Sequence, residues 1–378
     1  MGLLHATSIP ESLYLHYPLC QHVCSYCDFN VYRSKNHPDF NARWIEKFEA
    51  HLKKWLPESS KAPLRTLYLG GGTPSLLRPT ELHDLSKKLQ TFYDLENLEE
   101  WTVEANPESL NQDFLQSFKN LGGSRVSLGV QSFRANILKR LERLATCSHI
   151  ESGLSKVKDL GLQLNIDLMF GLPDQGLKDF SDDLEMALQF DPDHLSVYLL
   201  TLQPGHPWLK SKFLQKRWAS ETLVEEMYQH LCARTSEAGF LHYEVSNFAK
   251  PGRESLHNKN YWDPSSSYLA LGPGAHAYWR ENDRPVRSWN CRSISDWLSS
   301  EDGVDERENL DEEQQKLESL YLNFRTRSWL KVDAAWPQAL LQEMEREQLI
   351  ERRDDEIRMT EGRWILIDAV VGRLVRSV

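Results

Sequence analysis

Residues 20–29 read CQHVCSYCDF, a stretch that places Cys20, Cys24 and Cys27 within eight residues of one another. It follows directly on the apolar run 13–17. Three thiolates so close together can bind one metal centre. A cubane 4Fe-4S cluster has four irons and is usually held by four cysteines. A loop that offers three thiolates therefore leaves one iron open to a small molecule.

Two other interpretations of the three cysteines are open. Zinc sites are normally four-coordinate and commonly combine two ligand pairs. The remaining cysteines, Cys147, Cys232 and Cys291, are isolated in the sequence. His22 could complete a Cys3His zinc site, but it lies inside the same tight loop. Zinc is therefore the weaker alternative, and three ordinary core cysteines are weaker still.

Short apolar, β-rich runs recur along the first 202 residues, each separated from the next by enough residues for a helix. Strands that alternate with helices predict βα units and a parallel sheet. Six such units favour a partial barrel over a flat doubly wound sheet. The expected strands are 13–17, 66–72, 101–107, 125–132, 164–172 and 194–202, and the expected helices between them include 41–56, 80–92, 110–121 and 148–160.

The intervening segments carry helix signals of their own. Trp44, Phe48 and Leu52 share one face of the first helix. Thr80 is the expected N-cap of the second helix, because it follows Pro79 and precedes the apolar repeat. Gly122 and Gly161 stand where left-handed helix caps favour glycine, so we expect helices to end there.

Polar residues and glycines gather where the predicted strands end. The cysteines follow the first strand, GGGTPS (70–75) follows the second, and Glu104 stands near the end of the third. Gln131 ends the fourth strand and Asp167 lies on the fifth. In parallel α/β folds, ligands bind at the carboxyl ends of the strands. We therefore expect a single site at this end of the sheet.

The pattern changes after Leu202, and the chain is predicted to fall into three parts. Residues 1–280 would form the partial barrel with its C-terminal extension. Residues 281–310 are polar and charged, as in a linker or surface arm. Residues 311–378 would form a small helix-rich domain with a winged-helix-like arrangement. The fold class is thus α/β, a partial (β/α)6 barrel with a small helix-rich C-terminal domain.

Composition limits the environment and the partners. The chain has 378 residues, with 44 basic and 55 acidic side chains and a net charge of -11. This charge argues against nucleic acid or an anionic membrane as the main partner. Six cysteines, three of them in one loop, indicate a reducing compartment, and the cytoplasm is the simplest one. No secretory signal and no run of about 18 apolar residues is present, so no membrane span is expected.

Two later motifs contain histidines or glycines of interest. GPGAHA (272–277) imitates a dinucleotide-binding loop but lacks the following βα unit, so a backbone turn near the barrel mouth is the better interpretation. His257 opens HNKNYW (257–262). A lone histidine is usually a surface or core residue, but neutral imidazole is also a standard axial ligand of haem iron. Tyr261 and Trp262 could flank a flat macrocycle, while His242 and His276 are weaker candidates.

The C-x3-C-x2-C spacing, with Tyr26 just before the third cysteine, resembles the radical S-adenosylmethionine (SAM) superfamily. Within it, the chain is similar to oxygen-independent coproporphyrinogen III oxidases and their relatives, and most similar to the haem chaperone branch. The similarity runs from about Leu13 to the C-terminus and is weakest over 281–310. The motifs that carry it are YLHYPLCQHVCSYCDF, LGGGTPS, VEANPE, SLGVQSF, IDLMFGLP, HYEVSNFAKPG and HNKNYW.

The resemblance implies a role for each matching residue. Cys20, Cys24 and Cys27 would hold a 4Fe-4S cluster, and His257 would bind haem. The C-terminal segment would cover the barrel mouth. The positions that match SAM contacts of the family are Tyr14, Tyr26, Gly71, Gly72, Thr73, Glu104, Gln131, Arg143 and Asp167.

One departure separates the two branches. The oxidase branch has a further cysteine two residues after the third cluster cysteine, where this chain has Phe29. Only 12 residues precede Leu13, so we also expect no oxidase-type N-terminal extension. These features favour a haem carrier that transfers haem to an unknown acceptor protein, with room for a peripheral contact with a membrane acceptor. The competing hypotheses are a true coproporphyrinogen III oxidase and a degenerate scaffold that only binds proteins.

Overall fold

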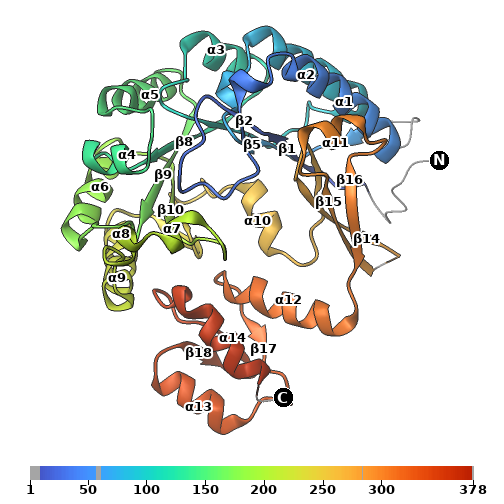
Figure 1. Ribbon diagram of the computed structural model, residues 1–378. Coiled ribbons are helices and arrows are strands. Elements are labelled where there is room, and N and C mark those ends of the chain that lie inside the picture. The colour runs from blue at the N-terminus through green and yellow to red at the C-terminus, as the bar shows by residue number, and fades with distance from the viewer. Residues whose placement is uncertain (1–8, 57–60, 283, 377–378) are drawn as a thin grey trace. The chain divides into compact units, whose positions relative to one another are not determined.

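The computed structural model describes residues 9–56, 61–282 and 284–376 (Figure 1). The chain divides into two compact units. The first unit holds the residues up to Asp167, together with Leu202–Pro204 and Ser266–Leu310. The second unit holds Leu168–Thr201, Gly205–Ser265 and the residues from Asp311 onward. Residues 1–8, where no export signal was predicted, lie outside the described residues.

A parallel sheet forms the core of the first unit. Alternate residues of its strands, such as Leu13, Leu67 and Val103, are apolar and fully buried, while the residues between them include polar side chains such as Glu104 and Ser127. The sequence prediction of parallel βα units is confirmed, with strand ends within three residues of the expected ones. The neighbouring strands are β8 (Arg125–Gln131), β7 (Glu100–Ala105), β5 (Thr66–Gly71), β1 (Ser12–Tyr17) and β13 (Leu269–Leu271), while β9 (Gln163–Phe170) continues the chain from the first unit into the second.

Helices connect these strands and lie on the outer side of the sheet (Figure 1). In the first of them, Trp44, Phe48 and Leu52 are buried on one face, as their spacing predicted. Gly122 and Gly161 adopt positive φ angles of 96° and 65° after two of the helices, so the predicted left-handed ends are confirmed. The helices are α1 (Phe40–Trp55), α2 (Pro79–Phe92), α3 (Gln112–Asn120), α4 (Ala135–Arg140) and α5 (Cys147–Asp159), with short 3-10 turns at Ser34–Asn36 and Pro74–Leu76.

Helix α2 begins one residue earlier than predicted. Arg78, rather than Thr80, is its N-cap, and Pro79 occupies the first helical position. The Glu81 carboxylate accepts a hydrogen bond of 2.8 Å from the Arg78 backbone N–H. Proline is well suited to the first turn because its missing N–H would have no helical partner there. The predicted cap at Thr80 was therefore wrong by two residues.

The first unit also contains an antiparallel sheet of β14 (His276–Glu281), β15 (Arg284–Asn290) and β16 (Val304–Asn309), with α11 (Ile294–Ser299) between the last two strands. Most of the stretch predicted as a polar linker or arm, 281–310, thus has regular structure. In β15, Val286, Ser288 and Asn290 alternate as buried residues. When only one face of a strand is buried, the residues on the other face are polar. Linkers are also rich in polar residues, so the composition alone could not distinguish the two. The division of the chain into domains stays a prediction.

Residues 168–201 and 205–265 of the second unit combine antiparallel strands with several helices. β12 (Asn247–Ala249) pairs with both β10 (His194–Leu199) and β11 (Leu241–Glu244). The long helices α6 and α9 pack on each other. The helices of this part are α6 (Leu177–Gln189), α7 (Pro207–Lys210), α8 (Lys212–Gln215), α9 (Glu221–Glu237) and α10 (Leu256–Trp262).

Residues from Asp311 onward form the helix-rich end of the second unit. Helix α12 (Glu312–Phe324) packs against α14 (Ile367–Val375), and α13 (Gln338–Arg346) packs against β18 (Ile350–Arg353). A small antiparallel sheet orders the strands β17 (Leu330–Lys331), β19 (Glu356–Met359) and β18 (Ile350–Arg353). The winged-helix-like arrangement stays a prediction. Across the described part of the chain, no helix has the length and apolar content needed to cross a membrane.

Candidate cluster and cofactor site

The cysteine loop is closed at its base by a short pair of strands. β2 (Leu19–Cys20) lies parallel to β3 (Tyr32–Arg33), and the Tyr32 N–H donates a 2.7 Å hydrogen bond to the Pro18 carbonyl. Inside the loop, the Cys27 N–H donates to the Cys24 carbonyl at 3.1 Å. The three thiols are therefore carried on a loop with fixed ends and an internal turn.

The glycine-rich segment after β5 lies directly against this loop. The Gly72 N–H donates to the Tyr17 carbonyl at 2.7 Å, and the Thr73 N–H donates to the Leu19 carbonyl at 2.8 Å. A Cβ atom on Gly72 would stand 2.6 Å from the Leu19 carbonyl oxygen. The backbone of the glycine segment can approach the loop this closely only because the side chain is absent.

Each thiol has a different polar neighbour. The Thr73 hydroxyl donates to the Cys20 sulfur at 3.4 Å, and an Arg143 Nη1–H reaches the Cys24 sulfur at 3.9 Å. The Phe29 backbone N–H donates to the Cys27 sulfur. Burial, opposed by the Thr73 hydrogen bond and assisted by the two neighbouring cysteines, raises the pKa of Cys20 to about 12. Burial likewise raises the pKa of Cys27 to about 11.

A chain of hydrogen bonds joins the surroundings of two thiols. An Arg143 Nη2–H donates to the Asn106 side-chain oxygen at 2.8 Å, and the Asn106 amide donates to the Thr73 hydroxyl at 2.8 Å. The neighbouring Nε of Arg143 is buried and has no hydrogen-bond partner among the described residues. A buried guanidinium N–H without an acceptor fits a carboxylate ligand. Burial lowers the pKa of Arg143, but Tyr26 and Cys24 outweigh it and leave this pKa raised.

Two carboxylates face the same side of the sheet. Glu104 accepts hydrogen bonds of 2.8 Å from the Gly71 N–H and 2.8 Å from the Tyr68 hydroxyl, and burial raises its pKa. Asp167 accepts from the Ser127 hydroxyl at 3.0 Å and from the Asn165 amide at 2.8 Å. Both acids are held in fixed positions by neighbouring strands.

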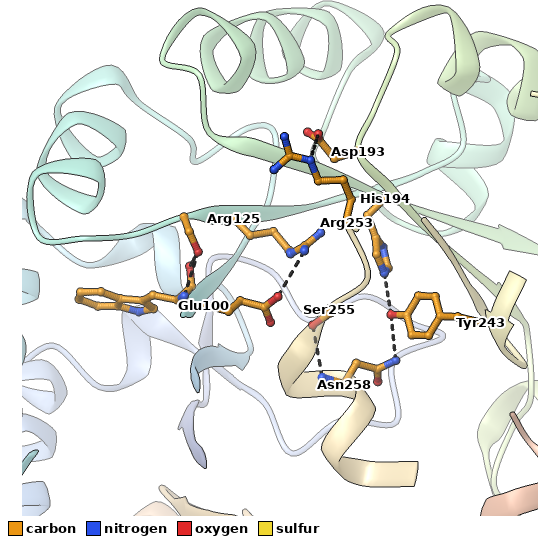
Figure 2. A network of polar contacts seen from close by, with 10 residues as sticks. Glu100, Arg125, Asp193, His194, Tyr243, Arg253, Ser255 and Asn258 are labelled. Carbon is orange, nitrogen blue, oxygen red and sulfur yellow. Dashed lines mark hydrogen bonds and ion pairs between the residues drawn. The ribbon is translucent and has the colours of Figure 1, made fainter. Parts of the chain in front are cut away.

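Alternation along the strands explains why these residues meet. Side chains two residues apart share one face of a strand. Gln131, at the end of β8, has a positive φ of 68°, and its side-chain nitrogen would lie 3.1 Å from a Cβ on Gly129. The same hypothetical Cβ would lie 3.1 Å from the Asn106 side-chain oxygen. Gln131 thus lies beside the chain that links the thiols. The amino-terminal ends of β7 and β8 instead carry a buried ion pair of 3.2 Å between Glu100 and Arg125 (Figure 2).

The two tyrosines among the candidates are both affected by burial. Burial raises the pKa of Tyr14, whose hydroxyl is hydrogen bonded to His16 at 3.0 Å, and Glu104 raises it further. Burial also raises the pKa of Tyr26, while Arg143 opposes the shift and the neighbouring thiols add to it. Both hydroxyls therefore stay protonated at neutral pH and can act as hydrogen-bond donors.

The donor set suits a cluster better than a single ion. Within the part of the chain that the structure describes, no three His, Cys, Asp or Glu side chains come close enough to share one metal ion. A cubane does not require this, because each cysteine of such a site binds a different iron. The three loop thiols interact electrostatically and have a cationic neighbour in Arg143. They therefore fit an iron-sulfur cluster, which would displace their protons on binding.

The candidate haem ligand, His257, lies in the second unit on helix α10. Its side chain is fully buried, and its Nε2 is hydrogen bonded to the Tyr261 hydroxyl one helical turn later at 2.9 Å. Burial lowers its pKa to about 3, so the imidazole is neutral, as metal ligation requires. Ligation through Nε2 would require this nitrogen to exchange the Tyr261 hydroxyl for iron.

The residue after His257 joins α10 to the strands of the second unit. The Asn258 amide donates to the Tyr243 hydroxyl at 3.3 Å, and that hydroxyl is hydrogen bonded to His194 Nε2 at 2.7 Å (Figure 2). Ser255 caps the start of α10, because its hydroxyl accepts from the Asn258 N–H at 3.3 Å. The helix that carries His257 is thereby fixed at its first turn.

Sequence reasoning missed several residues of the site. Asn106, Ser127 and Asn165 hold predicted residues in place, yet no role was predicted for them. The signal for Asn106 was present, since it stands two residues after Glu104 within VEANPE and shares a face with it in the predicted strand 101–107. Phe29, in contrast, is 71% exposed, so its side chain makes little contact with the loop.

Comparisons with known proteins place this arrangement in context. The model of the radical SAM superfamily matches residues 14–187. A relative from Escherichia coli, named heme chaperone HemW, is 36% identical and covers 71% of this chain and 70% of its own. A relative of the same name from Mycobacterium tuberculosis is 31% identical over 99% of this chain and 97% of its own. A third, from Bacillus subtilis, is 33% identical over 71% of each chain.

Among solved structures, the coproporphyrinogen III oxidase HemN from Escherichia coli superposes with a TM-score of 0.83. The match covers 97% of this chain and 90% of that one, at 20% sequence identity. At this identity the likeness is one of fold. It confirms the predicted radical SAM architecture, with a parallel-sheet core and a helical C-terminal part.

Proposed function

This chain belongs to the HemW family of the radical SAM superfamily, and from that membership we propose that it is a haem carrier. It would bind haem, hold a 4Fe-4S cluster with SAM, and pass haem to an acceptor protein. The relatives that define the family are named heme chaperones. That name, transferred to this chain, is the observation that carries the proposal.

The first unit would hold the cluster and SAM. Cys20, Cys24 and Cys27 would each bind one iron, leaving the fourth iron for the amino and carboxylate groups of SAM. When bound, a cluster of this kind supplies one electron for reductive cleavage of SAM. The unpartnered Arg143 Nε would suit the SAM carboxylate. The backbone of Gly71–Thr73 and the side chains of Tyr14, Tyr26, Glu104, Gln131 and Asp167 would orient the rest of SAM.

The residue at position 29 favours a haem carrier rather than a coproporphyrinogen oxidase. In the oxidase branch, a cysteine is expected there, and here an exposed phenylalanine stands in its place. An aromatic side chain next to the cluster loop offers a flat apolar surface rather than a thiol. Such a surface could contact a porphyrin macrocycle, but it carries no group that could take part in oxidising one.

The second unit would supply the haem ligand, His257. Its neutral imidazole is the form that binds iron. Because the ring is buried and engaged with Tyr261, haem binding would require the start of α10 to rearrange. The acceptor would be a protein of the same reducing compartment, the cytoplasm, or one that the carrier meets at the membrane surface. We expect no nucleic-acid partner and no membrane-spanning segment.

Haem titration tests the proposal directly. We expect the purified chain to shift the Soret band of added haem, and His257→Ala to abolish the shift. His276→Ala is the control, because that side chain is exposed. Circular dichroism would establish that His257→Ala is folded. An unchanged haem spectrum in folded His257→Ala would remove the ligand assignment, and no Soret shift in the unmodified chain would remove the carrier function.

The intact cysteine loop supports one competing activity, the oxidative decarboxylation of coproporphyrinogen III. The same sample decides between the two functions. After anaerobic reconstitution with iron and sulfide, the chain is given dithionite, SAM and coproporphyrinogen III. Formation of protoporphyrinogen IX would favour the oxidase. We expect no product, together with haem binding both with and without SAM.

A further inference from the structure

His16, on β1, is buried at the base of the cysteine loop, with only 6% of its surface exposed. Its Nε2 lies 3.0 Å from the Asn30 carbonyl oxygen, and its Nδ1 lies 3.0 Å from the Tyr14 hydroxyl. A carbonyl can only accept, so Nε2 carries the ring hydrogen and Nδ1 accepts from Tyr14. One imidazole in one tautomer therefore links a candidate SAM contact to the third residue after Cys27.

Two glycines enclose His16. A Cβ atom on Gly71 would lie 2.5 Å from the imidazole ring, and one on Gly272 would lie 2.3 Å from the His16 carbonyl oxygen. Both glycines have positive φ angles, of 108° and 114°. The Trp44 indole N–H also donates to the His16 carbonyl at 3.1 Å. Gly71 therefore restricts the ring on one side, while Gly272 and Trp44 hold the backbone carbonyl of His16.

Asn30 is itself held by hydrogen bonds near the glycine-containing turn at 272–274. Its side-chain amide donates to the Pro273 carbonyl at 3.0 Å and to the Arg292 carbonyl at 2.9 Å. A Cβ atom on Gly274 would lie 2.7 Å from the same amide nitrogen. Tyr32 strengthens the contact, because its hydroxyl donates to the Arg292 carbonyl at 2.9 Å. The GPG of GPGAHA thus contacts the far end of the cysteine loop.

We infer that His16 and Asn30, enclosed by Gly71 and the 272–274 turn, form a clamp that positions the cysteine loop relative to Tyr14. His16 is a positioning residue, since it acts through Tyr14 and Asn30. The inference rests on the proposed function, because the cluster and SAM are the groups that would be aligned. Loss of the clamp would leave the thiols present but would let the open iron and the SAM contacts drift apart.

The test compares His16→Phe, which keeps an aromatic ring but removes both hydrogen bonds, with His16→Gln, whose amide can still donate to Asn30. His51→Phe is the matched control, because His51 is also buried in the first unit but contacts Trp297 instead. The readouts are the change in the electron paramagnetic resonance spectrum of the reduced cluster on adding SAM, and the rate of iron loss to a chelator. Asn30→Ala, at a partly exposed residue, breaks the clamp without altering the core.

We expect His16→Phe to lose the SAM-induced spectral change and to lose iron roughly tenfold faster, the scale of one or two buried hydrogen bonds. His16→Gln should restore the slower loss, and Asn30→Ala should resemble His16→Phe. A wild-type spectral response and iron-loss rate in both His16→Phe and Asn30→Ala would overturn the clamp. Haem titration should be unchanged in every variant.

Hydrogen exchange separates failure of the clamp from failure of the proposed function. In the chain without metal, the amides of Cys27 and Tyr32 make hydrogen bonds within the loop and at its base. We expect them to exchange faster in His16→Phe and Asn30→Ala than in the unmodified chain or His51→Phe. If the unmodified chain takes up no cluster, the proposed function fails. The exchange rates of the Cys27 and Tyr32 amides in the metal-free chain would still show whether the clamp exists. Equal exchange in all four chains would refute it.

Discussion

Gly72 allows the glycine-rich segment to lie close to the cysteine loop. Its backbone N–H is bonded to Tyr17, and its missing side chain leaves room for the Leu19 carbonyl oxygen. The glycine segment and the cysteine loop therefore touch through their backbones. A change of one methyl group here acts on the distance between the predicted SAM segment and Cys20.

Gly72→Ala should reduce cluster uptake. A Cβ atom at 2.6 Å from the Leu19 carbonyl oxygen must push either segment aside, and overpacking of this kind typically costs about 1–3 kcal/mol. We expect less iron and sulfide bound per chain after reconstitution, measured by elemental analysis. Gly372→Ala is the control, because its nearest neighbour in α14 would lie at an ordinary 3.6 Å. Normal iron content in Gly72→Ala would show that the contact is not required.

Glu244 makes stability depend on pH. Burial raises the pKa of its carboxyl to about 7, while Asn247, Ser246, Asn258 and Arg325 oppose the shift. The folded state therefore favours the protonated acid. The resulting stabilisation is complete below the ordinary value of 4.5 and is lost as pH rises towards 7.

Glu244→Gln should remove this pH dependence, because glutamine does not ionise. We expect the free energy of unfolding of the variant, relative to the unmodified chain, to rise by about 3 kcal/mol between pH 4.5 and pH 8. Urea unfolding at several pH values measures the difference. A constant difference across this range would mean that Glu244 is ionised in the fold at pH 5.

The cysteines could be predicted because their spacing is local, whereas their supports could not. Nothing near His16 in the sequence indicates Asn30 as its partner, and Asn30 in turn bonds to Arg292, 262 positions away. Such contacts exist only once the parallel sheet brings distant segments together. Glycines gave a partial signal: Gly272 was interpreted correctly as a turn, but not as a contact of His16.

Helix α10 is the element on which the haem proposal depends. It has seven residues, and it places His257 and Tyr261 four positions apart, on one helical face. Their hydrogen bond competes with any bond from His257 Nε2 to iron.

Tyr261→Phe should strengthen haem binding. The substitution keeps the aromatic ring but removes the hydroxyl that competes with iron for Nε2, and a hydrogen bond of about 1 kcal/mol corresponds to roughly fivefold in affinity. Haem titration followed at the Soret band measures the dissociation constant. Tyr243→Phe is the control, since it removes a hydroxyl from the neighbouring network and leaves the His257 bond in place. Weaker binding by Tyr261→Phe would indicate that the hydroxyl itself supports haem.

Elements with strong patterns were predicted well, and those with mixed composition were not. The strands from β1 to β10 that form the βα units followed from short β-rich runs, because every second residue of these strands is a buried apolar one. β15 escaped prediction, because two of its alternate buried residues, Ser288 and Asn290, are polar. The difference lies in how many of the buried residues are apolar.

The proposed binding sites for the cluster with SAM and for haem lie in different units of the molecule. The cysteine loop and the candidate SAM residues belong to the first unit, while His257 belongs to the second. Each ligand should therefore protect its own set of amides.

Hydrogen exchange with mass spectrometry measures this separation. We expect cluster loading to slow exchange over residues 19–33 and 272–274, and to leave α12 to α14 unchanged. Haem should slow exchange in α10 and leave the cysteine loop unchanged. Protection of α10 by the cluster alone would show that the two sites are coupled and would contradict independent binding.

The buried thiols of the loop also determine how a newly made chain withstands air. Oxidation to sulfenic acids or disulfides proceeds through the thiolate. With the pKa of Cys20 raised to about 12 and that of Cys27 to about 11, only a minute fraction of either thiol is ionised at neutral pH. The thiols of the metal-free loop should therefore oxidise slowly, and binding of iron would displace their protons. Burial would thus protect the chain from oxygen before a cluster is assembled.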